Sequence, residues 1–156
     1  MPATTGIATG TFGGVQRHRT TRGVSNLPQT ATAAIFTITG TVKLWDVELE
    51  VTTITQVQLN NLKLVATPTI GSATDLTAVT DSTTSAVGTH YNATGTFAGA
   101  LVKSANGAHV AQAVPIVVTA GTVGLSASAS STGQYKAAVL WEPLTVDGNV
   151  TATAVT

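Results

Sequence analysis

The stretch AAIFTITGTVKLWDVELEVT, residues 33–52, determines how the chain is expected to fold. In its first half the large apolar side chains fall on even positions, from Phe36 to Leu44, with threonine or lysine between them. In its second half they fall on odd positions, from Trp45 to Val51, and acidic residues separate them. Alternation with period two is typical of a strand with one buried face, and the change of phase indicates a β-bulge or a sharp bend near Leu44 and Trp45.

The rest of the chain beyond this stretch repeats the pattern in shorter runs, separated by turn-forming residues. Threonine and valine are abundant, and their β-branched side chains favour pleated strands. No segment shows the apolar stripe and caps of a helix. The sequence therefore predicts an all-β protein, an antiparallel β-sandwich or jelly roll of about eight or nine strands.

Two hairpins are expected within this sandwich, because asparagine and glycine readily adopt left-handed backbone at tight turns. One would turn at Asn60-Asn61 and pair residues 46–58 with residues 62–69. The other would turn at Asn106-Gly107.

The composition excludes several classes of protein. Charged residues make up only 9% of the 156 residues, against about 25% in an ordinary soluble domain, and the formal net charge is zero. With no cysteine there is no disulfide scaffold and no thiolate metal site. The balanced charge argues against direct nucleic-acid binding, and no apolar run approaches the roughly 18 residues of a membrane helix. Either threonine hydroxyls keep a bare β domain soluble, or partners cover much of its surface.

The few charges are unevenly distributed along the chain. The first 32 residues contain no acid but hold a basic cluster, consisting of Arg17, His18, Arg19 and Arg22. They carry +3, whereas residues 33–156 carry −3. Because residues 1–32 are rich in glycine and threonine and lack periodicity, we expect an extended basic arm there, followed by the jelly-roll-like domain over 33–156. The arm is either an incidental loose terminus or a segment that orders against an acidic or carbonyl-rich partner.

Asp46, Glu48 and Glu50 are spaced two apart, so their side chains project from one face of the expected strand. They can be a solvated face opposite Val47 and Leu49, a cation site, or a dock for the arginines of a neighbouring copy. The partner-binding residues that the charge pattern indicates are therefore Arg17, His18, Arg19, Arg22, Asp46, Glu48 and Glu50.

No combination of a nucleophile, a base and an orienting group is evident. His90 and His109 stand at opposite ends of one stretch that a hairpin could fold together, but no third ligand accompanies them. We expect two surface histidines near strand ends. No phosphate-binding loop, dinucleotide fingerprint or G-x-S-x-G elbow is present. The sequence predicts a protein that is not an enzyme and has no cofactor or metal.

Three parts of the chain carry a resemblance to known proteins. They are Leu27–Thr30 with Ala34–Ile38, then Glu50–Ile54 through Asn60–Leu64 to Pro68–Gly71, and finally Ser131–Lys136 with Leu140–Leu144. Together they resemble small β-rich virion proteins of tailed bacteriophages, and among these the capsid decoration (cement) proteins. The resemblance implies a homotrimer that binds the major capsid protein on the outer capsid surface of the virion, after synthesis in the host bacterial cytoplasm.

Two other roles fit the same pattern. One is a receptor- or glycan-binding module of a head or tail fibre, and the other is a tail-tube or head-completion protein. Glycan sites commonly use exposed aromatic side chains, but the chain has only seven aromatic residues, and most fall on expected core faces.

Overall fold

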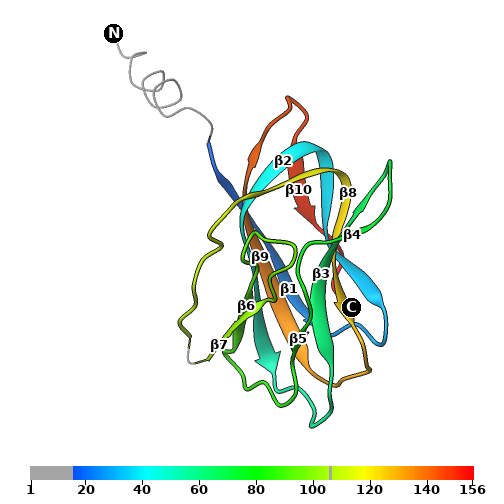
Figure 1. Ribbon diagram of the computed structural model, residues 1–156, viewed down its shortest axis with the longest axis vertical. Helices are drawn as coiled ribbons and strands as arrows, with labels where there is room; N and C mark the ends of the chain where they lie inside the picture. The colour runs from blue at the N-terminus through cyan, green and yellow to red at the C-terminus, as the bar shows by residue number, and fades with distance from the viewer. Residues whose placement is uncertain (1–15, 106) are drawn as a thin grey trace.

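The computed structural model describes residues 16–105 and 107–156, and these form ten β-strands and no helix (Figure 1). The strands are β1 (His18–Asn26), β2 (Thr32–Thr53), β3 (Asn61–Pro68), β4 (Thr74–Asp75), β5 (Thr80–Asp81), β6 (His90–Asn92), β7 (Val102–Ser104), β8 (Ile116–Ala127), β9 (Gln134–Pro143) and β10 (Asn149–Ala152). Every pair of neighbouring strands is antiparallel. The predicted all-β antiparallel sandwich is confirmed.

Strand β2, 22 residues long, joins the two halves of the sandwich. Its first half pairs with β10 and β8, and its second half pairs with β9 and β6. The strand turns at Gly40, whose φ of +59° and whose crowding by Thr145 leave no room for a β-carbon. The pairing with β9 then skips Trp45, between Leu44 and Asp46, which is a β-bulge. This bulge confirms the change of phase expected from the sequence.

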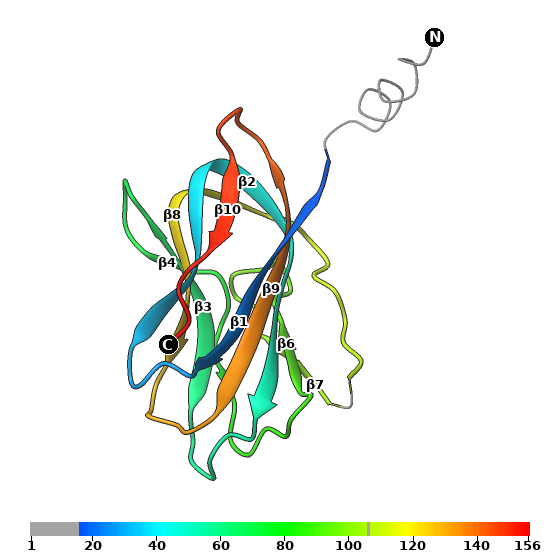
Figure 2. The same ribbon diagram turned by 180° about the vertical axis from the view of Figure 1, so that it is seen from behind.

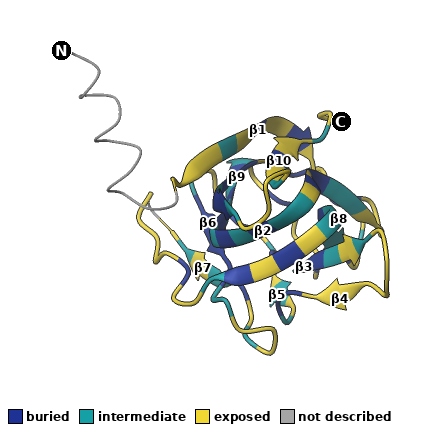
Figure 3. Ribbon diagram, turned by 90° about the horizontal axis from the view of Figure 1, so that it is seen from above, coloured by how far each residue is buried: buried dark blue, intermediate teal, exposed yellow. Residues whose placement is uncertain are grey.

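The core lies between the two halves of the sheet. Neighbouring strands follow the order β1-β9-β2-β8-β3-β4, and Figure 3 looks down on them, with β1 and β9 on one side and β3 and β8 on the other. Side chains from both halves meet in one cluster, which includes Phe36, Leu44, Leu64, Leu125 and Val139. The alternation of apolar and polar residues thus sends one face of each long strand inward and leaves the other face for the surface.

Strand β1 belongs to the sandwich, so the prediction of an arm over residues 1–32 is wrong for this part of the chain. It pairs with β9 from His18, opposite Trp141, to Asn26, opposite Gln134 (Figure 2). The partner strand lies more than 100 residues away in the sequence, and therefore the local composition did not reveal the pairing. Residues 1–15, the rest of the expected arm, lie outside the described residues.

The end of the chain runs beside β1 and fixes it in place. The backbone N of Asn26 donates to the carbonyl oxygen of Thr156 at 3.1 Å, and the backbone N of Thr156 donates to Oγ of Ser25 at 2.9 Å. Strand β1 and the C-terminal residues therefore close the same side of the sandwich.

Both hairpins predicted at asparagine turns are wrong. Strand β8 lies between β2 and β3, so the strands on either side of Asn60-Asn61 do not pair with each other. Asn60 is buried, and its carbonyl oxygen accepts hydrogen bonds from N and Oγ of Ser82, both at 2.9 Å. Packing against this distant loop overrides the local turn preference. At the second site β7 pairs with β6 and not with β8, and Asn106 lies outside the described residues.

Candidate functional site

Four charged side chains form two ion pairs on the outer side of β1, β9 and β2. Nη2 of Arg19 lies 2.9 Å from Oε1 of Glu48, and Nζ of Lys136 lies 2.9 Å from Oε2 of Glu50. Glu50 and Lys136 are directly opposite each other in the register of β2 and β9, so strand pairing itself brings them together. We call Arg19, Glu48, Glu50, Lys136 and the adjacent Asp46 the charged face.

Asp46 connects this face to the segments beside it. Its Oδ1 accepts hydrogen bonds from Nδ2 of Asn92 at 3.2 Å and from the backbone N of Gln112 at 3.1 Å. The three acids of β2 are half-buried and alternate with the buried Val47 and Leu49. The prediction that they share one strand face is confirmed, but the face is partly covered and is not simply solvated.

Arg22 has a structural role. Only 3% of it is exposed, and its guanidinium donates to the carbonyl oxygens of Thr153 at 3.2 Å and Ala154 at 2.6 Å. It also donates to the hydroxyl of Tyr135 at 3.4 Å. Burial raises the pKa of the Tyr135 phenol, and the adjacent guanidinium opposes this rise. Arg22 therefore ties the end of the chain to β1 and β9.

Arg17 and His18 rest on aromatic rings of their own chain. The guanidinium of Arg17 lies 3.8 Å from the ring centroid of Trp45, and the His18 ring stacks on Trp141 at 4.7 Å. Beside them, Nζ of Lys43 lies 3.2 Å from Oε1 of Glu142. Burial would raise the pKa of Glu142, but the hydrogen bond from Lys43 and the positive charges of Lys43 and Arg17 outweigh it and hold this pKa below its ordinary value.

The sequence-predicted site residues thus have partners within one chain. Arg19 pairs with Glu48, Arg22 holds the end of the chain, and Arg17 and His18 stack on tryptophans. The sequence indicated that arginines and acids could pair between neighbouring copies, and the pair observed here joins β1 and β2 of the same molecule.

His90 and His109 do come together, and Glu48 lies beside them. The two imidazole rings stack with centroids 4.5 Å apart, and Nε2 of His109 lies 2.9 Å from Oε2 of Glu48. One ligand atom from each of the three residues lies within 4.8 Å of the others. Sequence reasoning missed Glu48 as the third member, because the pairing of β2 with β6 that brings it to His90 is not a local feature.

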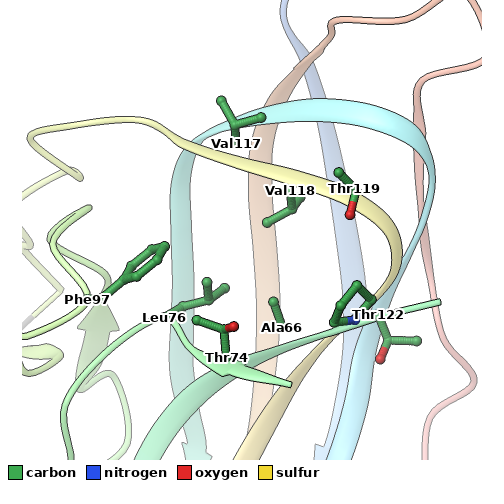
Figure 4. Close-up of a pocket in the computed structure, with 9 residues that line it drawn as sticks. Ala66, Thr74, Leu76, Phe97, Val117, Val118, Thr119 and Thr122 are labelled. Atoms are coloured by element: carbon green, nitrogen blue, oxygen red, sulfur yellow. The ribbon is translucent and has the colours of Figure 1, made fainter. Parts of the chain in front are cut away.

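A different surface lies on the opposite half of the sandwich, beside β3, β4 and the start of β8. A groove of about 220 Å³ lies there. Figure 4 shows Phe97, Leu76 and Val117 among the side chains that line it. Its lining is completed by Ala66, Pro68, Thr74, Val118, Thr119 and Thr122. Phe97 is 49% exposed and Val117 is 53% exposed, so the expectation that most aromatic residues face the core does not hold for Phe97.

A second hollow lies beside the groove and shares Thr119 with it; its other lining residues are Thr69, Ile70 and Ala120. Ile70 stands 91% exposed in this second hollow. Neither lining contains a charged side chain. We call these two hollows together the apolar groove, which is formed by alanine, valine, leucine, isoleucine, proline, phenylalanine and threonine alone.

Comparison of the chain with protein-family models, curated proteins and solved structures found no match. Among the described residues, no helix is long and apolar enough to span a membrane.

Proposed function

We propose that this protein is a structural component of a tailed-bacteriophage virion, a capsid decoration protein that binds the major capsid protein through its apolar groove. The single observation that carries the proposal is the uncharged groove, with Phe97, Val117 and Ile70 standing exposed along it. The bacteriophage assignment rests on the resemblance of residues 27–148 to small virion proteins.

The chemistry of the groove suits contact with another protein. Burying exposed apolar side chains against a partner is favourable, by about 25 cal/mol per Å² of apolar area removed from water. No charge in the groove lining has to be desolvated on binding. Threonine at Thr74, Thr119 and Thr122 supplies hydroxyls that can hydrogen-bond a partner's backbone. The expected partner surface is therefore apolar and uncharged where it meets the groove.

The shape of the fold suits the same role. The chain is a sandwich in which the long strands β2, β8 and β9 pair over most of their lengths. Such a scaffold adds contact area to an assembled shell without needing to refold on binding. We propose that the protein is a homotrimer, as the resemblance implies.

The alternative of a glycan-binding module has less support from the groove. Phe97 offers an exposed ring, but the lining contains no carboxylate, amide or basic side chain to bind several sugar hydroxyls. The alternative of a tail-tube or head-completion protein differs from a decoration protein in copy number, and the test below separates the two.

The proposal is tested by incubating the purified protein with heads from a phage whose copy of the gene is deleted. We expect the protein to cosediment with the heads, and native mass spectrometry of the free protein to give three copies. Failure to bind heads, or rings of six or twelve copies, would contradict the proposal. A truncation that removes residues 1–15 leaves β1 intact and asks whether the N-terminal segment contributes to occupancy.

A further inference from the structure

We propose that Glu48, His90 and His109 form a binding site for a divalent transition-metal ion of the zinc class. The site lies on the outer side of β2 and β6, beneath the segment that connects β7 to β8. This proposal is independent of the capsid role and concerns a different surface from the apolar groove.

Strand pairing places two of the three ligands. His90 of β6 is directly opposite Glu50 of β2, and Glu48 lies two residues along the same face of β2. His109 comes from the β7–β8 connection, which lies against β2 because Gln112 donates to Asp46. Three segments that are distant in the sequence therefore converge, and each contributes one side chain of a type that binds metal.

His90 carries a second, independent sign of a missing partner. Only 8% of the residue is exposed, and its Nδ1 is buried without a hydrogen-bond partner among the described residues. An unpartnered buried polar atom is costly, and most such atoms in proteins are satisfied. Ligation of a metal ion through Nδ1 would give the imidazole the partner that the described protein groups do not supply.

Glu48 is already oriented for ligation. Its Oε1 accepts a hydrogen bond from Arg19 at 2.9 Å, and this fixes the carboxylate while Oε2 points to His109. Outer groups that hold a ligand in this way are a regular feature of metal sites. Glu50 is opposite His90 in the strand register, and its Oε2 lies 3.9 Å from Nε2 of that ring, beyond hydrogen-bonding distance.

The cluster needs a small contraction to hold an ion. Two ligands of a tetrahedral zinc ion lie about 3.4 Å apart, since each bond is about 2.1 Å long. The ligand atoms here lie within 4.8 Å of one another, so a shift of about 1.4 Å or less closes the site. His109 can supply this shift by turning away from its stack on His90, because its side chain is 28% exposed and lies outside the strands.

Charge and ligand type favour a transition metal over calcium or magnesium. Three carboxylates, those of Asp46, Glu48 and Glu50, face the two cations Arg19 and Lys136, which leaves an excess of negative charge for the ion to neutralise. Two imidazoles with one carboxylate suit zinc, copper, nickel or iron, whereas calcium and magnesium prefer oxygen ligands alone. Three protein ligands leave at least one coordination position for water.

The test is isothermal titration calorimetry of zinc chloride into the metal-free, untagged full-length protein. We expect one zinc ion per chain, with calcium and magnesium chloride giving no comparable binding. Glu48→Gln and His109→Ala should each weaken zinc binding about tenfold or more. His18→Ala and Asp75→Asn, which remove a histidine and a carboxylate elsewhere, should leave the affinity unchanged.

Cobalt absorption, measured together with circular dichroism, separates lost ligation from lost folding. The wild-type protein should give the intense visible bands of four- or five-coordinate Co²⁺, and His109→Ala should lose them while its circular dichroism stays unchanged. The proposal is overturned if the wild-type protein binds no zinc, or if the Glu48→Gln and His109→Ala variants bind it as tightly as the wild type.

Discussion

The charged face and the apolar groove are both surfaces of one small sandwich, but their side chains differ in whether they have partners within the chain. On the charged face Arg19 and Lys136 each have an acidic partner within hydrogen-bonding distance. Along the groove Phe97, Val117 and Ile70 stand exposed with no charged neighbour in the lining.

The difference shows which surface of the protein favours binding of a partner. Binding to the charged face would have to replace ion pairs that already exist, and exposed pairs of this kind contribute only about 0–1 kcal/mol each. Binding to the groove removes apolar surface from water and breaks no existing pair. The charged side chains of the charged face therefore mainly connect strands to one another. The apolar groove, which has no charged side chain, is left for contact with a partner.

The largest effect is expected from Arg22, the buried member of the basic cluster. Arg22→Met removes the hydrogen bonds to Thr153 and Ala154 and leaves two carbonyl oxygens without their donor. We expect a loss of about 3 kcal/mol in the free energy of unfolding, measured by urea denaturation.

Arg19→Met is the matched control for this substitution, since it lies on the same strand and makes an exposed ion pair. It should cost less than about 1 kcal/mol. Equal losses from the two variants would show that the distinction between a structural Arg22 and a surface Arg19 is wrong.

The second prediction concerns the groove itself. Val117→Asp places a carboxylate where the partner is expected to be apolar, and it should weaken binding to phage heads by about thirtyfold, or about 2 kcal/mol. Val146→Asp makes the same change at a fully exposed residue outside the groove and should not alter binding. Cosedimentation at a series of protein concentrations measures the binding of both variants to heads. Equal binding by the two variants would show that the groove does not contact the capsid.

A smaller effect is expected at alkaline pH, from the two buried tyrosines. Burial raises the pKa of Tyr91 and Tyr135, so above pH 10 the unfolded chain releases protons that the folded chain retains. The contribution of these two tyrosines to the free energy of unfolding should be constant below pH 10 and should fall as the pH rises further. Thermal unfolding between pH 8 and pH 11 measures this, with the Tyr135→Phe variant expected to show a shallower decline.

The smallest effect is expected for the Glu50–Lys136 pair. Lys136→Met removes an ion pair between half-exposed side chains, so the midpoint of thermal unfolding should change by no more than about 2–4 °C. Binding to heads should not change. Lost head binding in a folded Lys136→Met variant would show that the charged face meets the partner.

The sequence predicted those features that depend on neighbouring residues. The change of phase at Leu44 and Trp45 located the bulge in β2, and the alternation around Glu48 placed the acids on one strand face. Strand β1 escaped prediction because its sequence, HRTTRGVSN, has no apolar alternation, and its partner β9 is far along the chain.

The candidate sites depend on contacts that no local pattern encodes. The turn preference of Asn60-Asn61 failed because burial of Asn60 against Ser82 outweighed it. The groove needs β3, β4, β8 and Phe97 to come together, and the metal cluster needs the pairing of β2 with β6. Of that cluster, only the proximity of His90 and His109 could be raised from the sequence.

The most direct test of the central claim is a cryo-electron microscopy reconstruction of the phage particle that carries this protein. We expect copies on the outer capsid surface, with β3, β8 and Phe97 against the major capsid protein and with Arg19, Glu48 and Lys136 facing solvent. A reconstruction in which the charged face is buried against the shell, or in which the protein is absent from the head, would contradict it.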